Sequence, residues 1–99
     1  MSVRMVRVKI RPDKVAEVEQ AVKEIFTALD AAQPEGVHYA SCKLADGETY
    51  VILLALDNDN VNPLTTITAL KEFQDNLHSW ITGPPIIEQL TTVGSYQLF

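Results

Sequence analysis

The sequence predicts an α+β fold in which a four-stranded antiparallel sheet carries two helices on one of its faces. Short segments rich in β-branched residues alternate with longer segments whose apolar residues recur every three or four positions. Their order is strand, helix, strand, strand, helix, strand, which is the split βαβ arrangement. The 99 residues, of which 46% are hydrophobic and 21% charged, suit one globular domain that spans residues 1–99.

The first strand and helix are expected in the N-terminal third of the chain. Residues 3–10 alternate between apolar and mostly basic side chains, and this period of two predicts a strand. Pro12 then opens a helix of about five turns, since its missing N–H costs little in the first turn. Pro34 and Gly36 end the helix. Its apolar stripe consists of Val15, Val18, Val22, Ile25, Phe26 and Leu29.

The next two strands are expected to form a hairpin. Residues 37–44 and 49–56 are the strand segments, and Asp46-Gly47 stands between them. This dipeptide readily adopts the positive φ angles of a tight turn, so the two strands should pair antiparallel.

The second helix and the last strand follow a polar turn at residues 57–60. Asn62 before Pro63 is typical of an N-cap followed by proline at the first helical position. The helix should end at Gly-Pro-Pro, residues 83–85. Residues 85–90 are then expected to add a short helical turn, and residues 91–99 to form the last strand. The apolar stripe of this helix is Ile67, Leu70, Phe73, Leu77 and Trp80 or Ile81.

Charge and composition exclude several partners. The formal charge is −5 and no cluster of lysines or arginines occurs, so neither nucleic acid nor an anionic membrane is expected as a partner. No apolar run approaches the ~18 residues of a membrane span. The N-terminal residues do not resemble a signal peptide, and the one cysteine, Cys42, reads as a buried thiol. A cytoplasmic location is therefore expected.

The third predicted strand is apolar on both faces, which predicts an assembly. Helices cover only one face of such a sheet, so Val51 and Leu53 need another cover. Each large apolar side chain that stays exposed to water loses about 1.5–3 kcal/mol of the stabilisation that burial would give. A second copy of the sheet, in a two-fold symmetric homodimer, is the expected cover. The alternative is a loop or the C-terminal segment folded over the same face.

His38 and Tyr39 are candidate site residues on adjacent positions of the second predicted strand, so they face opposite sides of the sheet. If His38 lies under the helices, it lines a pocket and is the best candidate for proton transfer. If it faces a partner subunit, it is an interface residue and Tyr39 becomes the pocket residue. The sequence leaves both arrangements open.

Three further aromatic residues are candidates for contacts with a ligand. Trp80 follows the stripe of the second helix, where it either plugs the helix end or forms one wall of an apolar pocket, and both can be true. Tyr50 and Tyr96 either donate a hydrogen bond to a ligand or serve as half-buried cross-strand partners. Two histidines forty residues apart and one cysteine do not make a zinc pattern, and no metal is expected.

Three stretches together carry a resemblance to a known family. They are VRMVRVKIRPDK leading into the first helix, the hairpin CKLADGETYVILLALDND, and the closing LHSWITGPPIIEQLTTVGSYQLF. Over nearly the whole chain this pattern of elements resembles the antibiotic-biosynthesis-monooxygenase-like group of dimeric α+β barrel proteins. The resemblance implies a ferredoxin-like subunit, a dimer whose two sheets face each other, and a pocket in each subunit between sheet and helices.

The resemblance also implies what chemistry to expect. Some relatives are cofactor-free oxygenases of polyphenols or quinols, and others degrade haem. The haem-degrading branch uses an asparagine on the first strand and a histidine after a tryptophan, whereas here the first strand has no asparagine and His78 precedes Trp80. No haem residue is carried over, and no cofactor is expected.

The resulting hypothesis is a cofactor-free monooxygenase that oxidises a small aromatic, quinol-type substrate in an apolar pocket. The alternatives are a homodimer that binds a small hydrophobic ligand without turnover, and a purely structural dimer.

Overall fold

The computed structural model describes residues 2–58 and 63–98. The chain runs through β1 (Ser2–Lys9), α1 (Val15–Ala32), β2 (Val37–Lys43), β3 (Thr49–Leu56), α2 (Thr68–Trp80) and β4 (Ile86–Leu90). One 3-10 turn, η1 (Pro12–Lys14), precedes α1, and another, η2 (Pro63–Thr66), precedes α2. The predicted order of strands and helices is confirmed.

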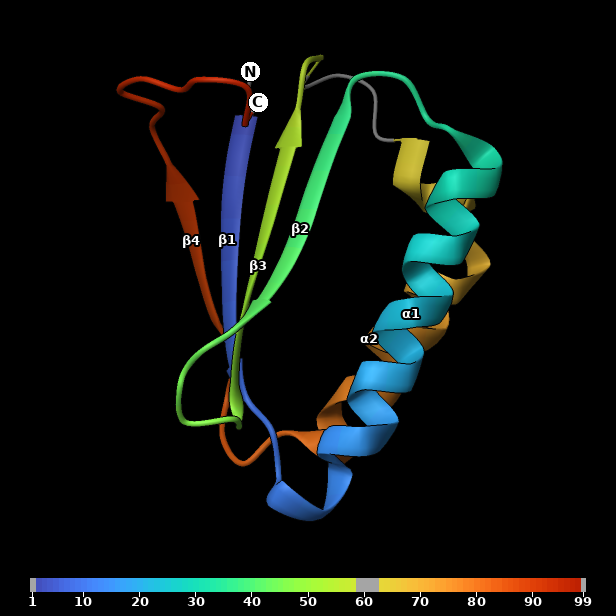
Figure 1. The fold of residues 1–99 in the computed structure, drawn as a ribbon, viewed down its shortest axis with the longest axis vertical. Coiled ribbons are helices and arrows are strands. Elements are labelled where there is room, and N and C mark those ends of the chain that lie inside the picture. The colour runs from blue at the N-terminus through green and yellow to red at the C-terminus, as the bar shows by residue number, and fades with distance from the viewer. Residues whose placement is uncertain (1, 59–62, 99) are drawn as a thin grey trace.

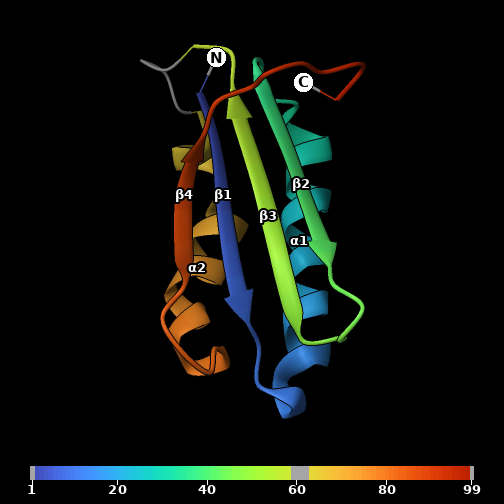
Figure 2. The same ribbon diagram turned by 90° about the vertical axis from the view of Figure 1, so that its left-hand side faces the viewer.

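The four strands form one antiparallel sheet with the order β2-β3-β1-β4. Both helices lie on the same face of this sheet, so the molecule has two layers (Figure 1). The other face, which we call the open face, is turned toward the viewer in Figure 2 and carries no helix. The predicted ferredoxin-like subunit is confirmed.

The core lies between the helices and the covered face of the sheet. The two helices turn their apolar stripes toward the sheet, as the three- and four-residue spacing predicts. Val18 and Ile25 of α1 are each 1% exposed, and Phe73 of α2 is 5% exposed. The other buried members of this cluster are Val8, Ile10, Tyr50, Ile52, Leu64, Ile67, Leu70 and Trp80.

The turn between β2 and β3 differs in detail from the predicted one. Gly47 adopts a positive φ of 75°, but Asp46 does not. Instead, the Asp46 carboxylate accepts hydrogen bonds from the backbone N–H groups of Glu48 and Thr49, each at 2.9 Å, and from the Thr49 hydroxyl at 2.6 Å. The longer turn still returns the chain antiparallel, as predicted.

The start of the second helix needs a correction. The α-helix begins at Thr68, and the stretch from Pro63 is a 3-10 turn instead of its first turn. The expected N-cap Asn62 lies outside the described residues, as do Asp59 and Asn60 of the expected polar turn.

The last strand was also predicted in the wrong place. Residues 86–90, expected to form a helical turn, are β4, and residues 91–98 form no strand. The register gives the reason. After the Gly-Pro-Pro turn the chain reaches β1 with Ile86 beside Arg7, and it runs out of partner when Leu90 has paired with Val3. Residues 91–98 pass beyond the end of β1 and pair with no strand in the described part of the chain.

The open face is only partly covered. The segment after β4 crosses the end of this face where β1 begins (Figure 2), and Val3 and Ala55 at that end are 2% and 0% exposed. Val51 and Leu53, farther along β3, remain half-buried. Cys42 is exposed on the same face, which corrects the expected buried thiol, because β2 is an edge strand that nothing covers here.

Candidate functional site

A cavity of about 360 Å³ lies between the covered face of the sheet and α2. Its volume is within the range of small-molecule sites, which run from about 300 to 1,000 Å³. Most of its walls are aliphatic or aromatic, and they come from three strands, η2 and α2. The lining residues are Arg4, Val6, Tyr39, Ile52, Leu54, Leu64, Thr65, Leu70, Lys71, Phe73, Gln74 and Leu77.

Tyr39 brings a phenol to this cavity. It pairs with Leu54 on β3, which in turn pairs with Arg4 on β1, and this register puts all three side chains on the covered face. The Tyr39 ring packs against Phe26 of α1 with a centroid distance of 5.5 Å. Burial raises the pKa of Tyr39 to about 12. A phenol is protonated at neutral pH even at its ordinary pKa of 10.0, so Tyr39 can serve as a hydrogen-bond donor.

Two cationic side chains give the cavity its charge. Arg4 comes from β1 and Lys71 from α2, so they approach from opposite layers. Within residues 2–58 and 63–98, neither side chain forms an ion pair with a carboxylate. No aspartate, glutamate or histidine lines the cavity. The site therefore favours a ligand that is apolar but carries an acidic or anionic oxygen.

His38 lies on the open face, which decides between the two arrangements that the sequence allowed. It pairs with Ala55, a residue of the open-face set, and its imidazole Nε2 is 3.0 Å from a carboxylate oxygen of Asp57. The cavity is on the other side of the sheet. His38 therefore lies on the face opposite the cavity, and Tyr39 lines the cavity. The interface and proton-transfer roles considered for His38, and ligand binding by Tyr39, stay predictions.

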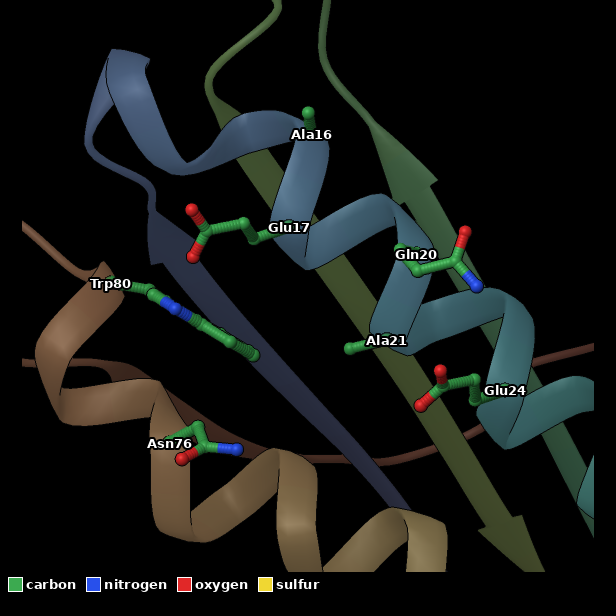
Figure 3. Close-up of a pocket in the computed structure, with 7 residues that line it drawn as sticks. All are labelled: Ala16, Glu17, Gln20, Ala21, Glu24, Asn76 and Trp80. Atoms are coloured by element: carbon green, nitrogen blue, oxygen red, sulfur yellow. The ribbon is translucent and has the colours of Figure 1, made fainter.

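Trp80 closes the end of α2, which is the first of the two roles considered for it, and its contact with a ligand stays a prediction. Its ring is 9% exposed and packs against Phe73 at a centroid distance of 5.8 Å, and its carbonyl accepts a 2.7 Å hydrogen bond from the Arg11 N–H. These contacts close the end of α2. The same side chain forms part of a groove between α1 and α2 (Figure 3), separate from the cavity that contains Tyr39.

The remaining candidates do not meet at the cavity. Tyr50 is 5% exposed and lies inside the core between β3 and the helices. Tyr96 is 86% exposed in the segment after β4. Their expected contacts with a ligand stay predictions. Among the described residues, no three His, Cys, Asp or Glu side chains are grouped so as to hold a metal ion.

Sequence reasoning missed the two cations of the cavity. A signal for Arg4 was present, because it shares its strand parity with Val6 and Val8 and is therefore a charge on the apolar face of β1. Lys71 had no comparable signal, since an exposed lysine beside a buried leucine is ordinary on an amphipathic helix.

The fold is shared with several solved structures. It is similar to a protein named "putative antibiotic biosynthesis monooxygenase" from Nitrosomonas europaea, with a TM-score of 0.78 and 14% identity over 95% of this chain and 100% of that one. A protein of the same printed name from Caulobacter crescentus gives a TM-score of 0.74 and 22% identity over 94% of this chain and 90% of that one. A protein of unknown function from Nitrosomonas europaea gives a TM-score of 0.75 and 14% identity over 96% of this chain and 91% of that one.

These similarities confirm, as a likeness of fold, the resemblance to antibiotic-biosynthesis-monooxygenase-like proteins. No protein-family model matches the sequence, and no curated protein matches it either. Neither helix in the described part of the chain is long and apolar enough to cross a bilayer.

Proposed function

We propose that the cavity beneath α2 binds a small aromatic molecule with an acidic hydroxyl, of the phenol or quinol class. The observation that carries this proposal is the combination of apolar walls with Arg4 and Lys71, two cations that have no carboxylate partner among the described residues. A ring fills the apolar part, and its ionised oxygen meets the two positive charges.

The charges also favour the reactive form of such a ligand. A cation within a few ångströms of an acidic hydroxyl lowers its pKa, often by one unit or more. The Tyr39 phenol, protonated at neutral pH, donates a hydrogen bond to the same oxygen or to a neighbouring one. Binding therefore promotes the phenolate without requiring a carboxylate or imidazole in the cavity.

The reaction we propose is oxygenation by dioxygen without a cofactor. An electron-rich anion reduces O2 itself. In an anthrone, a hydroxylated substrate whose ring CH2 is flanked by aromatic groups, this CH2 becomes C=O, one oxygen atom of O2 enters the product, and the other leaves as water with the two hydrogens. The substrate supplies all four electrons. The names of the neighbouring structures support this reaction class, and the chain contributes a cavity with mostly apolar walls and positive charge.

Oxygen consumption with a panel of anthrones and quinols tests the proposal. We expect uptake above buffer for at least one member, and a loss of about tenfold or more in kcat/KM when Arg4→Gln and Lys71→Gln are combined, because transition-state charge is no longer stabilised. Lys23→Gln, on the exposed side of α1, is the matched control and should change nothing. The absence of uptake with the whole panel would reject oxygenation.

Binding without turnover is a second candidate. The specific observation in its favour is that no carboxylate or imidazole lines the cavity and that His38 lies on the other face of the sheet. A phenol that raises Tm, is recovered unchanged under air, and loses its effect in the Arg4→Gln, Lys71→Gln variant would establish this candidate over the oxygenase.

We also propose that two copies pair through their open faces. Met5, Val51 and Leu53 form a half-buried apolar strip along this face, and Ile86 beside it is 41% exposed. The segment after β4 adds Val93 and Tyr96, which are 100% and 86% exposed. A symmetric partner would bury these side chains, and the burial of each large apolar side chain would stabilise the dimer by about 1.5–3 kcal/mol.

A further inference from the structure

A groove between the two helices has the opposite charge to the cavity beneath α2. It has a volume of about 410 Å³ and opens to solvent on the side of the helices away from the sheet (Figure 3). Five residues of α1 form one side, and two residues of α2 form the other. They are Ala16, Glu17, Gln20, Ala21 and Glu24, with Asn76 and Trp80.

The depth of the groove comes from small residues opposite a large one. The short side chain of Ala21 leaves space between the helices, and the Trp80 indole lies on the other side of this space. Trp80 is 9% exposed, and its ring N–H donates no hydrogen bond within the described residues. Figure 3 shows the indole edge-on between the two helices. Unlike the Tyr50 oxygen, the indole nitrogen is not fully buried, so its N–H is open to the groove and to solvent.

The rim of the groove is acidic. Glu17 points toward Trp80 in Figure 3, and Glu24 lies two turns farther along α1. Glu17 is 3.3 Å from the ammonium of Lys14, whereas Glu24 has no ion-pair partner in the described part of the chain. No arginine or lysine lines the groove.

We propose that this groove binds a small organic cation that also carries a neutral oxygen acceptor, such as an amino amide or an amino alcohol. The ammonium group meets the acidic rim to which Glu17 and Glu24 contribute, and the carbonyl or hydroxyl oxygen accepts the Trp80 N–H. The aliphatic body lies over Ala21. This site is distinct from the cavity, because the two differ in lining residues and in the sign of their charge.

Trp80 is the only tryptophan in the chain, so its fluorescence reports on the groove directly. The probe is 6-aminohexanamide, which carries one ammonium and one amide carbonyl. Hexanamide lacks the cation and hexylamine lacks the acceptor. We expect a saturable change in Trp80 emission with 6-aminohexanamide, weaker binding of hexylamine, and no saturation with hexanamide. Added salt should weaken binding, because the carboxylates are exposed.

A double variant, Glu17→Gln with Glu24→Gln, should weaken the binding of 6-aminohexanamide by about tenfold, because the rim then carries no negative charge to attract the ammonium group. The control variant, Asp30→Asn with Glu35→Gln, removes the same charge outside the groove and should leave Kd unchanged. An absent or non-saturable response, equal binding of hexanamide, or an unchanged Kd in the double variant would each overturn the proposal.

Discussion

The phenol oxygen of Tyr50 is buried without a hydrogen-bond partner in the described part of the chain. Its side chain is 5% exposed and lies on the covered face, where Tyr50 pairs with Val8 and Lys43 on the flanking strands. A buried polar group that loses its water without gaining a partner costs about 1–3 kcal/mol. The ring stabilises the core while the hydroxyl destabilises it.

Replacing Tyr50 by phenylalanine should therefore raise the free energy of unfolding, by about 1 kcal/mol, since only the hydroxyl is removed. Urea denaturation monitored by circular dichroism measures the change. Tyr96→Phe is the control, because that residue is 86% exposed and its hydroxyl is solvated, so stability should stay the same. A less stable Tyr50→Phe protein would mean that an ordered water satisfies this oxygen.

For single residues, the sequence identified candidate site residues but did not predict on which face of the sheet each one lies. Alternation along β2 separates His38 from Tyr39, but it does not say which set faces the helices. That choice is made by pairing with β3, which aligns Tyr39 with Leu54 on the covered face and His38 with Ala55 on the open one. Arg4 and Lys71 join Tyr39 only through the tertiary fold, so local pattern alone could not assemble the site.

The β2–β3 hairpin depends on one exposed carboxylate. Asp46 accepts three hydrogen bonds in its ionised form, the first of them from the Thr49 hydroxyl, and these lower its pKa from 3.8 to about 2. A lowered pKa in the folded state means that the carboxylate stabilises the fold above its unfolded pKa. This stabilisation is lost as the pH falls through the folded value.

Asp46→Ala should destabilise the protein between pH 5 and 7, and the difference from the wild type should shrink as the pH falls from about 4 to about 2. Urea titrations at a series of pH values measure it. Asp46→Asn is the matched variant, because it keeps one acceptor oxygen but cannot titrate. An undiminished difference between wild type and Asp46→Ala at the lowest pH would show that the carboxylate charge does not hold the turn.

Among the elements, β4 shows where local propensity fails. Residues 91–99 contain threonine, valine, tyrosine and phenylalanine, which favour strands, whereas residues 85–90 include Pro85, Glu88 and Gln89. Strand formation nevertheless follows the available partner. The backbone bonds from Arg11 to Trp80 and from Thr82 to Lys9 bring the chain to β1 immediately after α2, so pairing begins at Ile86. In the other strands and in both helices, the spacing of the apolar residues in the sequence matches the side of the element that is buried in the fold.

For the whole molecule, the order of elements and the placement of both helices on one face followed from the sequence. The periodicity of the apolar residues predicted the strands and helices, and the rules for connections between them left few possible arrangements of the sheet. The same reasoning predicted that the sheet is apolar on both sides, and the open face retains half-buried apolar residues such as Met5 and Leu53. The crossing segment covers only one end of this face, so one chain leaves apolar surface that a second copy would bury.

Sedimentation at micromolar concentration tests this assembly most directly. The wild-type protein should sediment as a species of about 22 kDa, twice the 11.0 kDa of one chain. Leu53→Lys, which places a charge in the middle of the open face, should sediment at 11.0 kDa and keep the same circular dichroism spectrum. A wild-type protein that sediments only at 11.0 kDa would contradict the pairing of open faces.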